Sequence, residues 1–493
     1  MNERASAGGA RSRRHLLRRQ GELLRRYLEK TVLPFSKHYA TQGDVLRRIR
    51  HVEDLRHLPF TTKQDVQAQP LDFIIVPDRN ILARRPSTIV KALLRGRQAV
   101  EESFEHEFRP SLMTFTTGRA AQPMPFLYTA HDLRRLQVSG DRIMRICGAK
   151  RDMRMLNMFP YAPHLAFWQT HYAGTEFGVL MLSSGGGKVA GTEGNLRFIQ
   201  KFNPDVLIGM PTFLYHVLQA AIGREMRCPQ ISKIILGGEK APPGMRRKLI
   251  ALAQQLGAGH VQVLSIYGFT EAKMAWPECP GPEGALSAGY HLFPDMGIVE
   301  IVDPKTGEPV GEGQPGEIVF TPLDARGTVV LRYRTGDLVE GGLVMEPCPH
   351  CGRLLPRLVG KISRTSEIRE MHLDKLKGTL VDFNQLEHVL DNVDDIGSWQ
   401  LELRKVHDDP LELDELILHV EKADHASEAQ LREELDQRFA SVIEMHPNKI
   451  IFETPEEIRR LQGVNLQMKE QRVVDHRPKP ETGATTPHNG AQP

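Results

Sequence analysis

The chain has 493 residues, 40% of them hydrophobic, and its 64 basic residues nearly balance 61 acidic ones. This length and composition predict two or three domains, each with its own hydrophobic core. The near balance of charge gives no sign of general nucleic-acid binding. No apolar run reaches the roughly 18 residues that a membrane-spanning helix needs, and no hydrophobic segment follows the basic start as it does in a secretory signal.

Five cysteines are spread over this length, with one Cys-x-x-Cys pair at Cys348 and Cys351. An odd number of cysteines in so long a chain argues against a disulfide scaffold and for a reducing compartment. We therefore expect a cytoplasmic protein without a membrane span and without a nucleic-acid partner.

The first thirty residues carry nine Arg or Lys against three Glu. From His15 onward, apolar residues recur at helical spacing: Leu16, Leu17, Leu23, Leu24, Tyr27 and Leu28. This spacing predicts an amphipathic helix with a solvated Arg face. A transit peptide or a contact with an anionic surface is the alternative interpretation of this basic arm, residues 1–30.

Two apolar runs that end in glycine, residues 205–214 and 233–239, have the pattern of parallel strands buried on both faces. A helix is expected over residues 242–256. This alternation of strand and helix predicts a layered α/β domain with its site at the carboxyl ends of the strands. Residues 297–337 change to short alternating strands, which predict a small antiparallel β subdomain.

The stretch Leu264-Ser-Ile-Tyr-Gly-Phe-Thr-Glu271 ends an apolar run in a turn and places a hydroxyl beside a carboxylate. Gly268 lets the backbone turn sharply and approach a ligand, and the ring of Tyr267 can lie against a base. Thr270 can donate to a phosphate oxygen, while Glu271 can hold a hard cation such as Mg²⁺. Taken alone, this pattern is also ordinary loop chemistry.

Two further stretches stand upstream and downstream of it, Leu236-Gly-Gly-Glu-Lys240 and Leu331-Arg-Tyr-Arg-Thr-Gly-Asp-Leu338. In this order, the three stretches resemble the nucleotide-binding motifs of adenylate-forming enzymes, and those of the phenylacetate:coenzyme A ligase branch in particular. Residues 52–65, 348–353 and 469–475 are also similar to that branch. The resemblance covers about residues 20–476 and implies ATP and Mg²⁺ as cofactors.

The resemblance implies a nucleotide site and assigns its residues. It implies these catalytic residues: Lys469, Thr270 and Glu271, with Glu271 on Mg²⁺. It implies these residues for binding of the nucleotide: Thr116, Thr117, Gly118, Gly238, Glu239, Tyr267, Gly268, Asp337 and Arg357. Asp337 would accept hydrogen bonds from the ribose hydroxyls, and Lys469 would bridge the acyl carboxylate and the α-phosphate during adenylation.

The chain departs from the family pattern at two of these places. In the phosphate loop, Arg119, Ala120, Ala121 and Gln122 stand where the family has two Thr, a Gly and a Lys. Thr116, Thr117 and Gly118 would still form a backbone nest for phosphate, with Arg119 as a substitute charge. In the second place, the residue before Lys469 is Met468 rather than the usual Gly.

The Cys348-Pro-His-Cys351 pair is compatible with half a zinc site, a redox pair or two indifferent thiols. Cys279 and His291 offer the two ligands that would complete a closed tetrahedral Cys3His site, and the phenylacetate ligase branch has similar residues there. Such a site would be structural, because it leaves no position open for water.

By the same resemblance we expect a large N-terminal domain over residues 1–362 and a small mobile α+β domain over residues 363–475. The composition of residues 476–493, rich in Pro, Gly, Thr and Asn, predicts a disordered tail. Residues 368–377 are expected to form a longer loop than usual, in a region that helps to build the thiol-acceptor tunnel of relatives. Residues 155–168 are aromatic and interrupted by proline, and both a core segment and an acyl pocket remain open for them.

The expected activity is ATP-dependent activation of a small, aromatic carboxylic acid as an acyl-adenylate, followed by transfer to the thiol of coenzyme A. One alternative is a biosynthetic enzyme that passes the acyl group to a carrier protein, an amine or another nitrogen nucleophile. Another is a non-catalytic paralogue on the same fold, because the phosphate loop lacks its Lys. A homodimer also stays open.

Overall fold

The computed structural model describes residues 2–116, 123–364, 368–373, 376–406, 414–443, 446–466 and 470–477. The chain divides into two compact units, one of residues 1–366 with 465–468, the other of residues 367–464 with 469–493. The predicted site residues Thr117, Gly118 and Lys469 lie outside the described residues, as does most of the predicted tail. Among the described helices, none combines the length and the hydropathy of a membrane span.

The first unit is built on a six-stranded sheet of order β4-β3-β5-β6-β7-β8. All neighbours are parallel except β8, which runs antiparallel to β7. The strands are β3 (Arg154–Asn157), β4 (Leu180–Ser183), β5 (Val206–Gly209), β6 (Lys233–Gly237), β7 (Gln262–Phe269) and β8 (Met274–Pro277). Every residue of β5 and β6 is buried, so the predicted parallel strands buried on both faces are confirmed.

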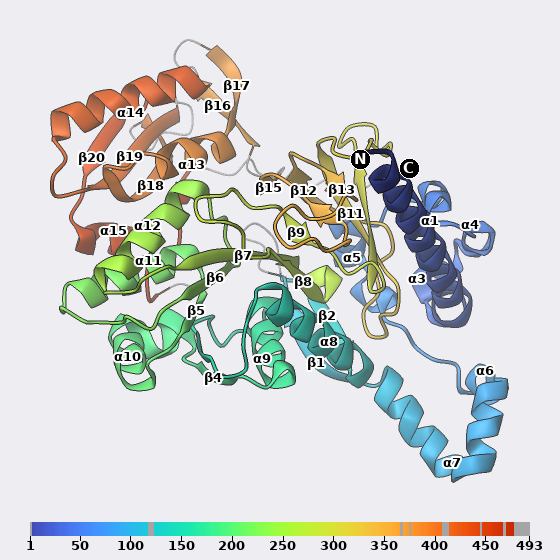
Figure 1. Ribbon diagram of the computed structural model, residues 1–493. Coiled ribbons are helices and arrows are strands. Elements are labelled where there is room, and N and C mark those ends of the chain that lie inside the picture. The colour runs from blue at the N-terminus through green and yellow to red at the C-terminus, as the bar shows by residue number, and fades with distance from the viewer. Residues whose placement is uncertain are drawn as a thin grey trace, which may run out of the picture. The chain divides into compact units, whose positions relative to one another are not determined.

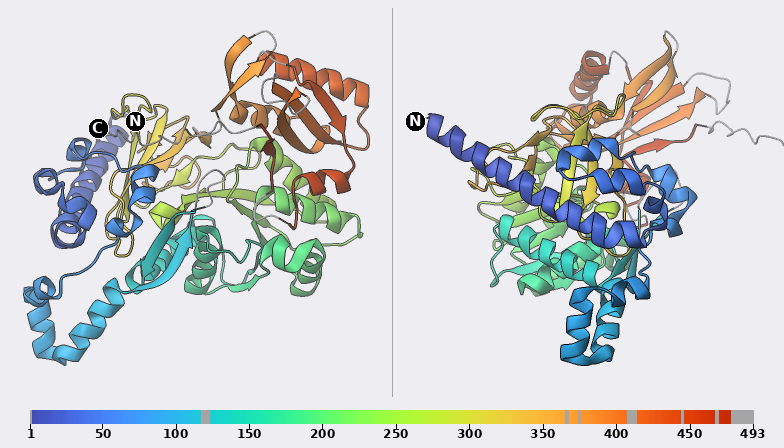
Figure 2. Two further views of the ribbon diagram at one scale, coloured as in Figure 1. Left: turned by 180° about the vertical axis from the view of Figure 1, so that it is seen from behind. Right: turned by 90° about the vertical axis from the view of Figure 1, so that its right-hand side faces the viewer.

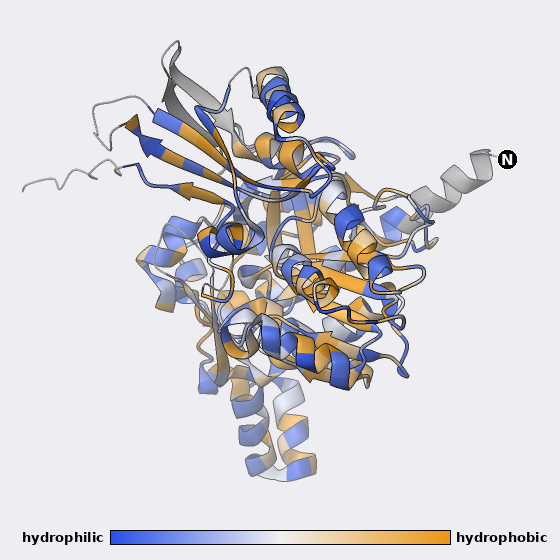
Figure 3. Cartoon of the chain, turned by 90° about the vertical axis from the view of Figure 1, so that its left-hand side faces the viewer, coloured by the Kyte–Doolittle hydropathy of each residue, from blue (hydrophilic) through white to orange (hydrophobic). Residues whose placement is uncertain are grey.

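Helices cover both faces of this sheet, with α8 and α9 on one face and α11 and α12 on the other (Figure 1). Their bounds are α8 (Ala130–Ile146), α9 (Leu165–Phe177), α10 (Gly186–Phe202), α11 (Pro211–Ile222) and α12 (Pro243–Gln255). The predicted helix over residues 242–256 is α12. Figure 3 shows hydrophobic strands at the centre of this unit and hydrophilic outer faces on the helices around them.

The N-terminal part of the first unit is helical (Figure 2). Its elements are α1 (Asn2–Tyr27), the π-helix η1 (Leu28–Val32), α2 (Leu33–Phe35), α3 (Lys37–Ala40), α4 (Gly43–Arg48), η2 (Val52–His57), α5 (Lys63–Ala68), η3 (Pro70–Phe73), α6 (Arg79–Ala83) and α7 (Pro86–Phe108). Leu24, Tyr27 and Leu28 are buried in the core while Arg25 and Arg26 are exposed, which confirms the predicted amphipathic helix.

Short β elements complete the first unit. They are the hairpin β1 (Pro110–Phe115) and β2 (Pro125–Thr129), the sheet of β9 (Tyr290–His291), β13 (Leu343–Val344) and β14 (Arg357–Leu358), and the sheet of β10 (Gly297–Val302), β11 (Gly316–Pro322), β12 (Tyr333–Val339) and β15 (Ile362–Arg364). The last sheet is antiparallel throughout, so the predicted antiparallel subdomain is confirmed.

The second unit has a sheet of order β20-β19-β18-β21. Its elements are β16 (Ile368–Leu373), β17 (Leu376–Asp382), α13 (Phe383–Asp391), β18 (Ile396–Lys405), β19 (Asp414–Lys422), α14 (Glu428–Ile443), β20 (Lys449–Phe452), α15 (Pro455–Leu461) and β21 (Val473–Asp475). Trp399, Leu418 and Phe439 are fully buried in its core. Thr454 caps α15 by accepting from the Glu457 backbone.

One expectation for this unit is wrong. Residues 368–377 were expected to form a loop longer than usual, but residues 368–373 and 376–382 pair there as the antiparallel strands β16 and β17. The pairing gives the backbone hydrogen-bond partners that a long loop would have to find in solvent.

Candidate functional site

The candidate site is centred on the turn between β7 and β8. Tyr267 and Gly268 belong to the end of β7, and Thr270 and Glu271 begin the short helix η4 (Thr270–Ala272) before the chain returns along β8. Gly268 pairs with Ala275, and an added Cβ at Gly268 would lie only 2.6 Å from the Ala275 Cβ. A glycine is therefore required for the tight return that presents Thr270 and Glu271 at the carboxyl end of β7.

Glu271 is held by the neighbouring antiparallel sheet. The Tyr333 hydroxyl on β12 donates to Glu271 Oε1 at 2.7 Å. Burial raises the pKa of Glu271, and the nearby Asp337 charge adds to this, while the Tyr333 hydrogen bond and Arg364 act against it. The net rise means that the ionised carboxylate lacks sufficient positive partners, which is the condition that a bound cation would relieve.

Asp337 also links the two sheets of the site. It is only 3% exposed. Its Oδ2 accepts from the Tyr267 hydroxyl at 2.8 Å, and its Oδ1 lies 3.0 Å from Arg364 Nε on β15. Each carboxylate oxygen has a second lone pair, so a ribose hydroxyl would have to share these oxygens or displace one of the two partners.

Glu239 follows β6, next to the segment that follows β5. The Thr212 hydroxyl donates to Glu239 Oε2 at 3.1 Å, whereas Glu239 Oε1 is buried and has no hydrogen-bond partner within the described part of the chain. Buried carboxylate oxygens are rarely left without a donor. Gly238 before it has a left-handed backbone (φ 79°), which turns the chain at the end of the strand.

Thr116 is the one predicted phosphate-loop residue that the structure describes, and it directly follows β1. Thr116 is 8% exposed, and it bonds across the hairpin to Met124 through both its backbone and its hydroxyl. The Thr270 hydroxyl lies 3.5 Å from the Phe115 carbonyl, so the start of the loop lies beside the η4 turn. Thr117 and Gly118 fall outside the described residues, and their position relative to Thr270 stays a prediction.

Arg357 belongs to a different sheet from Tyr267 and Asp337. It sits on β14, where it pairs in register with His291, and its guanidinium donates to the carbonyls of Ala288 and Glu346. The structure brings Arg364, and not Arg357, to Asp337. The sequence analysis also missed Tyr333, although Tyr333 lies only four residues before Asp337 in the same strand and in the same motif.

Cys279, His291, Cys348 and Cys351 form a second cluster, and their ligand atoms all lie within 4.8 Å of one another. The two closest pairs are Cys279 Sγ with Cys348 Sγ and Cys351 Sγ with His291 Nε2, both at 3.6 Å. Two thiolates on one tetrahedral Zn²⁺ would be roughly 3.8 Å apart, so the donor set fits such an ion. The sequence prediction that these residues come together is confirmed.

The chemistry of the cluster agrees with its geometry. Burial, with help from the positive Arg357 and Arg353, lowers the pKa of His291 to about 4, which keeps the imidazole neutral and able to bind a metal. The Cys348 carbonyl accepts from the Gly352 amide at 2.8 Å, and this bond folds the Cys-x-x-Cys segment into a tight turn. A neutral imidazole and three clustered thiols are a structural donor set.

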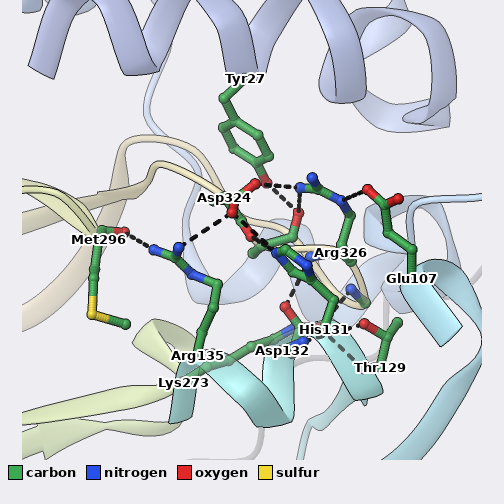
Figure 4. Close-up of polar contacts among 12 residues, drawn as sticks. Tyr27, Glu107, Thr129, His131, Asp132, Arg135, Lys273, Met296, Asp324 and Arg326 are labelled. Carbon is green, nitrogen blue, oxygen red and sulfur yellow. Dashed lines mark hydrogen bonds and ion pairs between the residues drawn. The ribbon is translucent and has the colours of Figure 1, made fainter. Parts of the chain in front are cut away.

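A buried ion pair holds the other side of the η4 turn (Figure 4). Lys273 follows η4 with a left-handed backbone (φ 54°), and its ammonium lies 2.9 Å from Asp132 Oδ2. Both residues are buried, at 7% and 3% exposure. Asp132 is the third residue of α8, where it caps the helix by accepting from the Thr129 amide.

Asp132 has more partners than Lys273. Its carboxylate also accepts from the amides of Arg326 at 2.9 Å and Gly327 at 2.8 Å. Although burial opposes ionisation, the Lys273 charge and these amides hold the pKa of Asp132 below its ordinary value. The Lys273 ammonium, besides Asp132, faces the Tyr128 ring at 5.0 Å. Asp132 therefore joins α8, the 326–327 segment and the η4 turn.

The chain is similar in sequence to known enzymes. The AMP-binding enzyme family model matches residues 63–322. A phenylacetate-coenzyme A ligase of Thermus thermophilus is 27% identical over 339 residues, which cover 68% of this chain and 67% of that protein. A phenylacetate-coenzyme A ligase of Escherichia coli is 25% identical over 413 residues, 80% of each chain.

A solved structure has the same fold. It is a 2-hydroxyisobutyryl-CoA ligase in the postadenylation state, which aligns with a TM-score of 0.71 and 17% identity over 93% of this chain and 89% of that chain. The predicted α/β fold class and the predicted membership of the adenylate-forming superfamily are thereby confirmed.

The buried pair generates a prediction on stability. Asp132→Asn and Lys273→Met should each lower the free energy of unfolding by about 3 kcal/mol, because each leaves one buried charge without its counterion. The double variant Asp132→Asn/Lys273→Met should lose clearly less than the sum, since it removes both charges. Denaturant unfolding of the wild type and the three variants measures the coupling.

The matched control is the exposed pair of Arg142 and Asp295, whose contact is as short, at 2.6 Å. Arg142→Gln should cost at most about 1 kcal/mol, because water already solvates this pair. Additive losses in the Asp132/Lys273 double variant would contradict a direct coupling between the two charges.

Proposed function

The chain belongs to the family of AMP-binding enzymes, and we propose that it uses ATP to activate a small, aromatic carboxylic acid as an acyl-adenylate. The acid oxygen attacks the α-phosphorus of ATP, pyrophosphate leaves, and the acyl group then passes to the thiol of coenzyme A with release of AMP. Two relatives named phenylacetate-coenzyme A ligase, 27% and 25% identical, support the aromatic acid and the acceptor.

The observation that carries the proposal is the convergence of polar groups at the carboxyl ends of adjacent strands. Glu239 after β6, with its unpartnered oxygen, would accept from the amino group of adenine, which Gly238 lets approach the backbone. Tyr267 at the end of β7 would lie against the base. Asp337 would take the ribose hydroxyls in place of Arg364 or Tyr267.

The phosphates would lie beside the η4 turn. Thr270 would donate to the α-phosphate, and the β1–β2 loop with Thr116, Thr117 and Gly118 would supply amides for the other two phosphates. Glu271 would hold Mg²⁺. Burial raises the pKa of this carboxyl, and a hard cation beside it would stabilise its ionised form. These side chains act mainly by positioning and by charge stabilisation.

Residues outside the described part of the chain complete the proposal. Lys469 would bridge the acid carboxylate and the α-phosphate, where negative charge grows during adenylation. Transfer to a carrier protein or to an amine stays the alternative second step, because the chain differs from the family pattern around residues 368–377. We place the reaction in the cytoplasm, which the five free cysteines support.

We also propose a structural Zn²⁺ on Cys279, His291, Cys348 and Cys351. The proposal is supported by the distances among the three sulfurs and the imidazole nitrogen, which lie within 4.8 Å of one another, as the ligands of one tetrahedral ion would. With four protein ligands the ion would have no open position, so it would tie the 279 and 291 segments to the 348–351 turn and take no part in the acyl transfer.

The central test is acid-dependent ATP:pyrophosphate exchange over a panel of aromatic and aliphatic acids, followed by addition of coenzyme A. Glu271→Gln should lower exchange on the order of a hundredfold, because a neutral amide binds Mg²⁺ poorly. Glu283→Gln changes an exposed carboxylate that is not assigned to the site and should leave exchange unchanged. No exchange with any acid would contradict the enzyme proposal, and exchange without thioester formation would contradict only the acceptor.

The pH profile of exchange gives a second check on Glu271. Because burial raises its pKa, activity should fall with falling pH at a midpoint above the ordinary value of about 4.3, as the carboxylate takes up a proton. Higher Mg²⁺ should move that midpoint to lower pH, since the cation favours the ionised form. A pH midpoint that stays the same at all Mg²⁺ concentrations would show that Glu271 does not hold the cation.

The zinc proposal predicts close to one Zn²⁺ per chain in freshly purified protein, by elemental analysis. Cys348→Ser/Cys351→Ser should lose the metal and lower the melting temperature, because metal binding contributes to folding stability. Cys228→Ser is the control, since Cys228 is buried far from the cluster in sequence and outside it. Wild-type protein without zinc would rule out the site.

The role of Lys469 is tested by separating the two half-reactions. Lys469→Ala should slow adenylation about a hundredfold in single turnover from acid and ATP, because one charge-assisted contact to the transition state is lost. Transfer from synthetic acyl-adenylate to the acceptor should keep its rate. Lys188→Ala, a change in another lysine, is the control, and equal losses in both half-reactions would reject the assignment.

A further inference from the structure

Residues 79–108 form a helical arm that projects from the rest of the first unit in all the views (Figures 1, 2 and 3). The arm consists of α6 and α7, and α7 bends at Gly96, whose backbone is left-handed (φ 83°). The two halves of α7 then lie side by side, because Lys91 Nζ donates to Ser103 Oγ at 2.6 Å across the bend.

The base of the arm is fixed to the unit. Phe108 packs edge-to-face on Phe35 with ring centroids 5.8 Å apart, and Glu107 pairs with Arg326 at 2.8 Å. Arg85 lies over the Phe35 ring at 5.1 Å. These contacts hold the base, while the bend at Gly96 forms the far tip.

The outer face of the arm is unusually apolar for a surface. Of the fifteen large hydrophobic side chains that are exposed among the described residues, five lie on the arm, between residues 81 and 94. Leu93 and Leu94 are the most exposed of the fifteen, at 82% and 79%. Ile89 and Val90 precede them by one helical turn, so the four residues form a single stripe on the first half of α7.

Positive charge surrounds this stripe. Residues 84–100 contain five basic residues and no acidic one. The basic residues are Arg84, Arg85, Lys91, Arg95 and Arg97. The acidic residues of the arm, Glu101, Glu102, Glu105 and Glu107, all lie on the second half of α7. The residues that flank the bend, Leu93 to Gln98, therefore combine exposed leucines with two arginines and no acidic residue.

We propose that the tip of this arm docks on an anionic membrane surface. Leu93 and Leu94 would enter the boundary between headgroups and acyl chains, and Arg95 and Arg97 on either side of the bend would contact lipid phosphates. A helix with an aliphatic face and Arg or Lys beside it is the pattern of interfacial helices. Each basic residue near an anionic leaflet adds to the attraction.

Two other occupants fit less well. A second copy docked through the same bend would place Lys91, Arg95 and Arg97 against the same three residues, and residues 86–100 contain no acidic residue to offset this repulsion. A protein partner is usually met by aromatic anchors, whereas residues 84–100 contain no Phe, Tyr or Trp. The membrane proposal does not rest on the proposed function, because lipid binding is measured without turnover.

The test is flotation of the full-length protein with vesicles of phosphatidylcholine alone and with an equimolar mixture of phosphatidylcholine and phosphatidylserine. The wild type should bind the mixed vesicles and not the neutral ones, and added salt should weaken binding. Leu93→Ser/Leu94→Ser and Arg95→Gln/Arg97→Gln should each weaken binding about tenfold or more.

Matched controls separate the tip from exposed leucine and arginine in general. Leu180→Ser/Leu286→Ser changes two leucines that are 61% and 76% exposed elsewhere, and Arg48→Gln/Arg56→Gln changes two exposed arginines. Both control variants should float like the wild type. All variants should melt like the wild type, because surface changes cost little stability.

Three outcomes would overturn the proposal. One is a wild type that does not float with the mixed vesicles, and another is a leucine variant of the tip that floats equally well. The third is a dimer in solution, or capture of an acidic protein, that depends on Leu93 and Leu94 while vesicle binding is absent. That result would make the arm a protein interface.

Discussion

The buried ion pair of Asp132 and Lys273 is the constraint on which the arrangement of the candidate site depends. Lys273 adopts a left-handed backbone (φ 54°), which costs a residue other than glycine roughly 1 kcal/mol or more. The ion pair with Asp132 fixes that conformation, because the Asp132 carboxylate is itself held by the amides of Arg326 and Gly327. Lys273 ends the η4 turn and Asp132 lies in the first turn of α8. The position of Thr270 and Glu271 therefore depends on the position of the start of α8.

Two carboxylates of the same site lack sufficient partners within the described residues. Glu239 has one buried oxygen without a hydrogen-bond donor, and burial raises the pKa of Glu271. Burying carboxylates in this state costs free energy that the fold alone does not recover. A ligand that brings an amino group and a cation would supply these partners, and a magnesium nucleotide carries both.

Local patterns in the sequence predicted the parts of the fold that are locally encoded. β5 and β6 were predictable because continuous apolar runs ending in glycine have few other folds. The bond from Asp132 to Lys273 spans 141 positions, and no spacing rule finds it. Arg357 was assigned to the nucleotide by resemblance, yet strand pairing places it beside His291 and gives Arg364 to Asp337.

The strand β8 explains why the cysteine cluster matters to a site that it does not enter. Lys273 holds the start of β8, and just past its end the Glu278 carboxylate accepts from the Ser265 amide at 2.7 Å and pairs with both terminal nitrogens of Arg246. Cys279 is the next residue. An ion on the cluster would therefore fix the end of β8, as Lys273 fixes its start. Because Ala275 of β8 pairs with Gly268 of β7, both restraints would also limit the movement of Thr270 and Glu271 in the turn between the two strands.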